Sequence, residues 1–373
     1  MPEIPEDQWT LDALCGHLQM AAFLEAWTIP YYMAAMFSIV DRANLAYQHL
    51  QSVLHQEMLH LQLVANVANA YGRSPWLNPA WFSYEPNEVP YLQFDFTPSS
   101  TPTAVSDPRD EYKPRNAAIG PLDKSRVNTM CLIEFPDWST GSKPAYRSNM
   151  TEYDSIGQFY DALEFGARQL KSAPIVGGRR QVDMFSAFYR RLPRVTVDSS
   201  GEAGLAQVLM LLDVIRDQGE AAKADDPIHR PNENTADDRY PTLSHYEKFR
   251  QIRKHKPLPK IYPDTVPVTD PDKYTTAQGH LERILIDNFA AFVTALNELF
   301  AGNHPDDFVP LMVTLGANIL TCWRNGVTPK FTDTTPLASM QLASPQLASP
   351  QLASIDLSDR SFYDLTGQNG STS

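Results

Sequence analysis

The chain has few cysteines, no long basic run and no recognisable export signal. Its three cysteines, Cys15, Cys131 and Cys322, lie far apart among 373 residues, and no two of them form a C-x-x-C pair. This usage argues against a disulfide framework and favours a reducing, cytoplasmic setting. The first ten residues, MPEIPEDQWT, are acidic and polar, which is unlike a secretory signal.

Basic residues are scarce relative to acidic ones. The chain has 31 lysines and arginines against 44 acidic residues, which gives a formal net charge of −13. Polyanions are bound through clustered positive charge, so nucleic acid and anionic membrane surfaces are not expected as partners. Hydrophobic residues make up 43% of the chain, which is enough for a sizeable core. We expect small molecules as partners, and the sequence leaves a homo-oligomer open.

One segment, residues 13–40, is apolar over a length that could cross a membrane. It contains Gln19, Glu25 and Pro30, however, and Asp41 and Arg42 follow directly. A carboxylate in the middle of a span is costly in lipid unless it faces a protein interior. We therefore expect a helix buried in protein and no membrane span.

The rest of the chain predicts a mainly helical domain over residues 1–330, followed by a low-complexity tail over 331–373. The tail contains a five-residue QLASP repeat, whose composition is typical of disordered segments. Two irregular insertions are expected, at about 73–150 with short strands around Val89–Phe96, and at 221–241. Apolar periodicity and helix stop signals predict the following helices: 11–40, 43–71, 124–134, 154–171, 202–219, 242–254, 275–301 and 307–325.

The first two predicted helices each carry a single charged residue. Glu25 is the only one between Asp12 and Asp41, and Glu57 is the only one between Arg42 and Arg73. Helices that are apolar nearly all round are buried, and a buried carboxylate costs several kcal/mol unless it is paired or bound to a cation. Neither run contains a lysine or arginine, so two adjacent antiparallel helices predict a shared cation.

The second helix also supplies an imidazole. Glu57 and His60 are three residues apart and share one helix face, while His49 and His55 point elsewhere. This Glu-x-x-His spacing, with a lone Glu on the neighbouring helix, is the arrangement of carboxylate-bridged di-iron bundles. Mixed carboxylate and imidazole ligands suit iron or manganese and also accept zinc. The alternative is a chance spacing with a histidine that is satisfied by a backbone carbonyl.

A di-iron bundle needs further ligands from a second pair of helices. Glu164 borders the apolar face of the helix at 154–171, Glu220 follows the helix at 202–219, and His245 begins the helix at 242–254. Each of these helices carries several charges, so a solvated surface position is an equally good interpretation of either glutamate. The aromatic residues nearest the predicted site in sequence line a substrate pocket or belong to the core: Trp27, Tyr31, Tyr32 and Phe159.

A family resemblance covers roughly residues 10–330. It is carried, in chain order, by LEAWTIPYYMAAMFSI, HQEMLHLQLVANVANAYG, DSIGQFYDALEFGARQL, IRDQGEAA and LSHYEKFRQI. These segments resemble the ferritin-like domain of iminophenylpyruvate dimer synthases, enzymes of violacein-type pathways. The resemblance implies a ferritin-like four-helix bundle with long irregular insertions and additional C-terminal helices. It departs from the pattern at Gln158, where relatives have a carboxylate, and at Thr242, which removes a second intact Glu-x-x-His.

Carried over by position, the resemblance implies six metal ligands: Glu25, Glu57, His60, Glu164, Glu220 and His245. The resulting expectation is a non-haem oxidoreductase or oxygenase of secondary metabolism that holds two irons. It would use dioxygen or peroxide on a small aromatic or amino-acid-derived metabolite. Oxidative coupling of aromatic 2-imino acids is an alternative reaction, and a non-catalytic metal-binding or storage bundle is an alternative of another class. One ion instead of two, and manganese or zinc instead of iron, also remain open.

Overall fold

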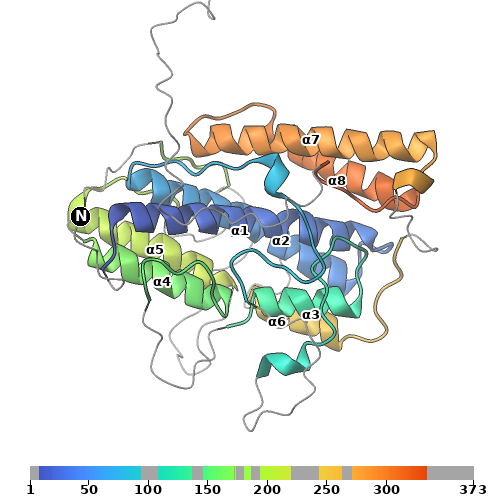
Figure 1. Ribbon diagram of the computed structural model, residues 1–373, viewed down its shortest axis with the longest axis horizontal. Coiled ribbons are helices and arrows are strands. Elements are labelled where there is room, and N and C mark those ends of the chain that lie inside the picture. The colour runs from blue at the N-terminus through green and yellow to red at the C-terminus, as the bar shows by residue number, and fades with distance from the viewer. Residues whose placement is uncertain are drawn as a thin grey trace, which may run out of the picture.

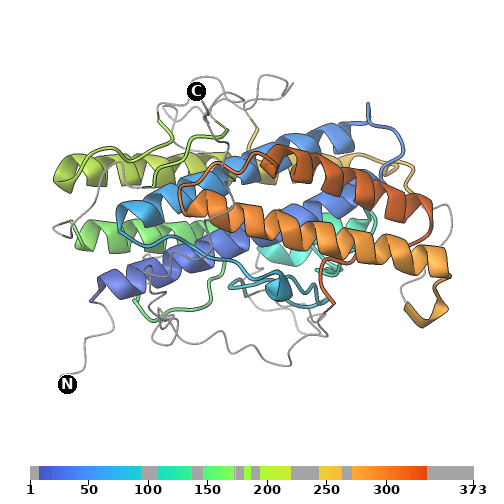
Figure 2. The same cartoon turned by 90° about the horizontal axis from the view of Figure 1, so that it is seen from above.

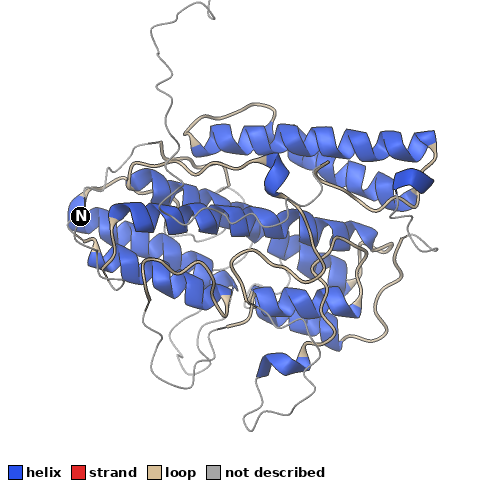
Figure 3. Ribbon diagram, viewed as in Figure 1, coloured by secondary structure: helices blue, strands red, loops and turns tan. Residues whose placement is uncertain are grey.

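The computed structural model describes residues 8–93, 108–136, 146–171, 173, 180–185, 194–219, 243–262 and 271–333. Within these ranges the regular structure is helical, as Figure 3 shows, and β pairing is limited to isolated bridges. The α-helices are α1 (Leu11–Ser38), α2 (Leu45–Ala70), α3 (Lys124–Ile133), α4 (Ile156–Gln169), α5 (Gly201–Gly219), α6 (His245–Lys254), α7 (Thr276–Phe300) and α8 (Phe308–Arg324). Three short 3-10 helices accompany them: η1 (Pro79–Trp81), η2 (Pro108–Glu111) and η4 (Pro271–Lys273).

Helices α1 and α2 form the centre of the molecule. Each begins at a capping side chain, Thr10 for α1 and Asn44 for α2, which accepts a hydrogen bond from a backbone N–H of the first turn. Pro30 lies inside α1, and the helix continues past it to Ser38. Both helices are buried over most of their length and pack against each other, as their nearly continuous apolar sequence predicts.

The layer that faces α1 and α2 is divided along its length. Helices α4 and α5 pack on each other and complete a four-helix bundle with one half of α1 and α2. Helices α3 and α6 pack on each other beside the other half (Figures 1 and 2). Four helix ends therefore meet near the middle of the molecule: the end of α3, the start of α4, the end of α5 and the start of α6. We call this meeting place the seam.

Helices α7 and α8 form a hairpin that lies on the opposite side of α1 and α2 from α4 and α5 (Figure 1). Its contacts include polar anchors as well as apolar packing. The Trp323 indole N–H donates to the carbonyl of Ala34 at 2.8 Å. Asn297 of α7 exchanges two hydrogen bonds, both of 2.8 Å, with the backbone of Leu77. The hairpin thus covers the apolar face of α1 and α2 that the other helices leave open.

Three amide side chains on α2 hold irregular backbone against the helix. Gln62 accepts from two backbone N–H groups of the segment 180–185, and Asn66 donates to that segment and to the carbonyl of Val195. Asn69 donates to the segment and to α7. Buried backbone groups need such partners, and here side chains take the place of a neighbouring strand.

The helical bundle expected from the sequence is confirmed, and each predicted helix ends within three residues of the observed one. Of the predicted strand at Val89–Phe96, the structure describes residues 89–93 and contains only bridges from Leu92 to Val89 and to Tyr153. The predicted insertion at 221–241 and the repeat tail from 334 lie outside the described residues. None of the described helices is long and apolar enough to cross a membrane.

The cysteines provide a first test of this packing. All three are buried free thiols, and burial raises the pKa of Cys15 to about 11 and that of Cys322 to about 12. Burial raises the pKa of Cys131 as well. Only the thiolate reacts readily, so at pH 8 about a thousandth of Cys15 is in the reactive form, against about a quarter of an ordinary cysteine. We expect a thiol-specific chromogenic reagent to label none of the three quickly in the folded chain and all three after denaturation. Rapid labelling of the folded chain would contradict the packing.

Candidate metal centre

Among the described residues, three carboxyl groups and two imidazoles meet at the seam. Glu25 comes from the middle of α1, Glu57 and His60 come from α2, Glu134 caps the end of α3, and His245 is the first residue of α6. All five are at most 2% exposed. Residues separated by more than two hundred positions in the chain are therefore collected in one buried cluster, which we call the centre.

Glu57 lies between the two histidines. One of its carboxylate oxygens, Oε1, is 3.0 Å from Nδ1 of His245, and the other, Oε2, is 3.8 Å from Nδ1 of His60. Each imidazole also faces a second carboxylate, Glu25 at 3.4 Å from His60 and Glu134 at 3.5 Å from His245. The two rings stack with their centroids 5.3 Å apart. The donors thus form two sets that share Glu57. Each set adds one imidazole and one further carboxylate, His60 with Glu25 and His245 with Glu134, and we call Glu25 and Glu134 the terminal carboxylates.

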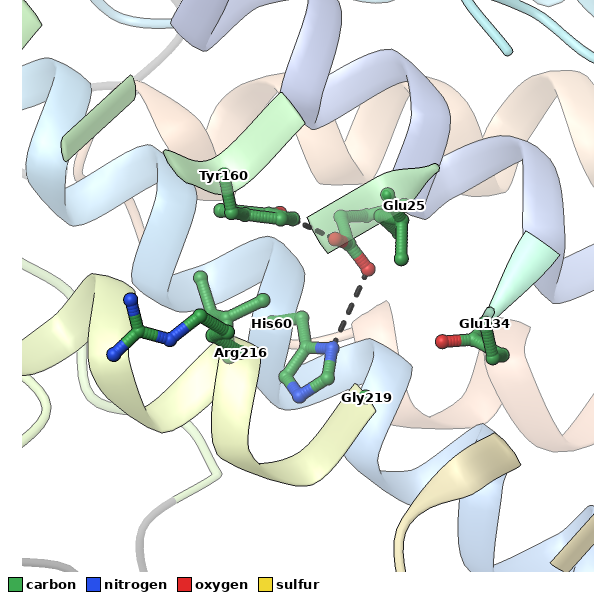
Figure 4. Close-up of a pocket in the computed structure, with 8 residues that line it drawn as sticks. Glu25, His60, Glu134, Tyr160, Arg216 and Gly219 are labelled. Carbon is green, nitrogen blue, oxygen red and sulfur yellow. Dashed lines mark hydrogen bonds and ion pairs between the residues drawn. The ribbon is translucent and has the colours of Figure 1, made fainter. Parts of the chain in front are cut away.

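The imidazoles and terminal carboxylates form hydrogen bonds with neutral polar side chains around the centre. Nε2 of His60 lies 3.0 Å from the side-chain oxygen of Gln218, and Nε2 of His245 lies 3.0 Å from that of Gln56. Two tyrosine hydroxyls donate hydrogen bonds to the terminal carboxylates. Tyr160 donates to Glu25, as Figure 4 shows, and Tyr32 donates to Glu134 at 2.8 Å. Contacts of this kind fix the orientation of metal-ligating side chains.

Burial and crowding shift the acidity of these groups. Burial, together with the neighbouring charges of Glu25 and Glu134, raises the pKa of Glu57 well above its ordinary value. Burial also acts on Glu25, but hydrogen bonds and the charge of His60 outweigh it and lower the pKa of that carboxyl. Burial lowers the pKa of His245 well below its ordinary value, with smaller effects from nearby cationic groups. Without a cation, one carboxyl of the crowded pair therefore keeps its proton.

Several atoms of the centre have no hydrogen-bond partner among the residues that the structure describes. These are Oε2 of Glu25, Oε1 of Glu57 and Nδ1 of His245, all fully buried. A carboxylate oxygen facing an imidazole nitrogen at close range needs a proton or a cation between them. One donor atom each from Glu57, His60 and His245 lies within 4.8 Å of the others. The donor set consists of oxygen and imidazole nitrogen, so it fits a non-haem iron site.

A small pocket lies beside the centre and is lined by Glu25, His60 and Glu134. Figure 4 shows Glu25 between Tyr160 and His60, with Glu134 facing them from the other side. The pocket has about 190 Å³ of empty space, counted out to its mouth. Arg216 of α5 also lines it, and its guanidinium is held by carboxylates that include Glu164. Glu134 lines the pocket as well, so the pocket reaches residues of both donor sets.

The structure brings together four of the six predicted ligands, Glu25, Glu57, His60 and His245. It does not bring Glu164 to them, because that carboxylate forms ion pairs with Arg168 and Arg216 on the outside of α4 and α5. Glu220 lies outside the described residues, as does Thr242. Gln158 lies in the first turn of α4, and its side-chain oxygen accepts a hydrogen bond from the backbone N–H of Asp154.

The histidines and aromatic residues named from the sequence are placed as follows. His49 contacts Gln251 and His55 is exposed, so neither reaches the centre. Tyr32 does reach it, through Glu134. The hydroxyl of Tyr31 and the indole N–H of Trp27 donate to backbone carbonyls, and Phe159 packs in the core, so these three do not line the centre.

Glu134 and Tyr160 are the main residues that the sequence prediction missed. Glu134 ends the helix predicted over 124–134, and it is the lone charge in the apolar stretch CLIEFP. That is the same signal that identified Glu25 and Glu57. Helical spacing places Tyr160 on the apolar stripe of α4, and nothing in that spacing shows that its hydroxyl reaches Glu25.

Comparisons with known proteins agree with this architecture. A family model described as Ferritin-like matches residues 18–254. The chain is also similar to a solved structure described as a ferritin like protein from Caulobacter vibrioides, with 38% sequence identity and a TM-score of 0.72. That similarity covers 87% of this chain and 99% of the other. A search of curated proteins found no match. The chain belongs to the ferritin-like family.

Proposed function

We propose that the protein is a non-haem iron oxidoreductase with two iron positions that share Glu57. The observation that carries this proposal is the arrangement of two imidazole and carboxylate sets around one buried carboxylate. Glu25, Glu57 and His60 would hold one iron, and Glu57, Glu134 and His245 would hold the other. Iron bound there would supply the reduction of dioxygen or peroxide. A carboxylate that serves two metals through its two oxygens is typical of di-iron bundles.

The residues around the centre have separate tasks in this proposal. Burial of all five ligands keeps bulk water away from the reacting groups. The Tyr160 and Tyr32 hydroxyls hold the two terminal carboxylates in place by hydrogen bonds. The pocket beside Glu25 and His60 would admit the oxidant. Its limited size favours a small molecule there.

We further propose a small aromatic or amino-acid-derived metabolite as the substrate, in a pathway of secondary metabolism. The support is the resemblance of five segments to iminophenylpyruvate dimer synthases, which couple aromatic 2-imino acids oxidatively. We also propose a cytoplasmic location, which the three buried free thiols support. A homo-oligomer is compatible with this function and is left to measurement.

Anaerobic loading with Fe(II) tests the proposal. We expect about two irons per chain by metal analysis, and an absorbance transient when dioxygen is added to the loaded protein. A chain that binds no iron would overturn the proposal. Two irons without a transient, and without consumption of a second substrate, would indicate a metal-binding or storage bundle. Competition with Mn(II) and Zn(II) in the same assay identifies the preferred metal.

A further inference from the structure

The outer side of α8 is exposed and apolar. The helix packs on α7 and α1 with its inner side, and the hairpin that it forms with α7 lies at the front of the molecule in Figure 2. Val313 is 65% exposed, more than any other large hydrophobic side chain in the described part of the chain, and Val309 is 44% exposed. The exposed residues between the ends of the helix lie on one side of it, which we call the α8 face: Val309, Pro310, Val313, Thr314, Ala317 and Thr321.

The two threonines add little polarity to the α8 face. The hydroxyl of Thr314 donates to the carbonyl of Pro310 at 2.8 Å, and that of Thr321 donates to the carbonyl of Ala317 at 2.8 Å. Both hydroxyls are therefore satisfied within the helix, which leaves the threonine methyl groups for packing. A helix on the surface of a protein normally presents a charged or polar side to water, so an outer side of this kind indicates a binding surface.

Charges of opposite sign stand at the two ends of the α8 face, and none stands between them. Asp306 and Asp307 are exposed at the start of α8, where the side chain of Asp307 makes no capping hydrogen bond. Arg324 is exposed in the last turn, with its guanidinium 5.6 Å from the ring centroid of Tyr262. None of these three charges forms an ion pair within the described part of the chain. The α8 face thus has an acidic end, an apolar middle and a basic end.

We propose that the α8 face is the interface of a dimer in which the α8 helices of two copies pair antiparallel. A two-fold interface uses the same surface on both copies, so that surface must complement itself. Antiparallel pairing places Asp306 and Asp307 beside Arg324 of the partner subunit, whereas parallel pairing would bring like charges together. It also places the start of each helix beside the end of the other, which favours the two helix dipoles.

The pairing has a register and an expected strength. When Asp306 lies opposite the partner's Arg324, Val313 lies opposite the partner's Ala317, so a large side chain meets a small one. The 17 residues of α8 make a contact about 25 Å long. That is a small interface, so we expect a dimer that dissociates in the micromolar range.

The proposed interface leaves the pocket open. The α7–α8 hairpin lies on the opposite side of α1 and α2 from α4 and α5, whose residues line the pocket. Dimerisation and iron binding can therefore be measured separately. The oligomeric state tests this inference whether or not the protein proves to have iron chemistry.

Sedimentation velocity over a concentration series gives the first test. The wild type should shift from the mass of one 41.9 kDa chain toward twice that mass as the concentration rises. Val313→Lys puts an ammonium group into the apolar middle and should remain monomeric over the same series. Met210→Lys makes the same change at an exposed apolar side chain of α5, so it should dimerise like the wild type. A monomeric wild type, or a Val313→Lys variant that dimerises as well as the wild type, overturns the proposal.

A charge exchange tests the antiparallel arrangement. Arg324→Glu should weaken dimerisation because acidic groups then face each other. Adding Asp306→Lys and Asp307→Lys to the same chain should restore it, since every copy then carries both exchanged ends. Arg324→Glu also removes the contact with Tyr262, and the restored dimer would show that this loss is not the cause. No weakening in the single variant, or no recovery in the folded triple variant, overturns the proposal.

Cross-linking decides the geometry if the triple variant fails to fold. In the proposed register the two copies of residue 317 are offset by about 6 Å along the helices, and those of residue 309 by about 18 Å. Paired helix axes lie about 8–10 Å apart, so a bismaleimide with a spacer of about 10 Å should join Ala317→Cys chains and leave Val309→Cys chains apart. The three native thiols are buried and should not interfere. Equal joining of both variants, or of neither, overturns the antiparallel pairing.

Discussion

Glu57→Gln should remove both irons from the protein, whereas Glu134→Gln should remove only one. Glu57 presents one oxygen to each histidine, so its loss takes a ligand from both proposed positions. Glu134 faces His245 alone, so its loss affects one position. Loss of a direct ligand should weaken binding by more than the roughly 100-fold that supporting contacts cost. Anaerobic Fe(II) titration followed by metal analysis gives the count.

Glu164→Gln is the matched control for both variants. It removes a glutamate of the same bundle whose carboxylate is taken up by Arg168 and Arg216, so two irons should remain. Each of the three substitutions keeps the side-chain shape and replaces a carboxyl group with a neutral amide. Two irons in Glu57→Gln would show that this residue is not shared. Two irons in Glu134→Gln would remove Glu134 from the ligand set, and a loss in Glu164→Gln would restore the prediction made from the sequence.

Iron should also stabilise the fold by a large margin. A ligand that binds only the folded state contributes about 4 kcal/mol at a free concentration a thousandfold above its Kd. Here the ligands come from α1, α2, α3 and α6, so the metal would tie four helices together at the seam. We expect the thermal midpoint to rise by several degrees on anaerobic Fe(II) loading and to fall back after chelation. The same treatment should leave the midpoint of Glu57→Gln unchanged.

The gain from iron should shrink as the pH falls. Burial and the adjacent carboxylates raise the pKa of Glu57, so the metal-free folded chain holds a proton there that iron must displace. Lower pH favours that proton and protonates other ligands, which weakens iron binding. The difference in thermal midpoint between loaded and metal-free protein should therefore decrease steadily on acidification. A difference in thermal midpoint that stays constant as the pH is lowered would contradict carboxylate and imidazole ligation.

The sequence predicts the first half of the centre well because burial and charge are both visible in it. Helices α1 and α2 are apolar on every side, so a lone carboxylate in each had to be buried. The periodicity then placed His60 on the face of Glu57. The same reasoning applied to CLIEFP also identifies Glu134, because it is the lone charge at the apolar end of the helix predicted over 124–134.

The second half could not be predicted in the same way. Helix α4 has one apolar face, and Glu164 at its edge looked equally suited to the centre or to the surface. Its i, i+4 partner Arg168 was visible in the sequence, but Arg216 comes from α5 and only the packing of α4 on α5 reveals it. The contacts of Tyr160 with Glu25 and of Gln218 with His60 depend in the same way on helices that are distant in the chain.

The division of the second layer into two short helix pairs has a consequence for biosynthesis. The first two ligand-bearing helices are complete by residue 70, but the centre also needs Glu134 and then His245. A nascent chain released up to α5 would offer all three carboxylates but only one of the two imidazoles. The set around His60 would be complete in sequence, and the set around His245 would still lack its histidine. The order of the proposed ligands along the chain would therefore leave the second iron position unfinished until α6 has docked.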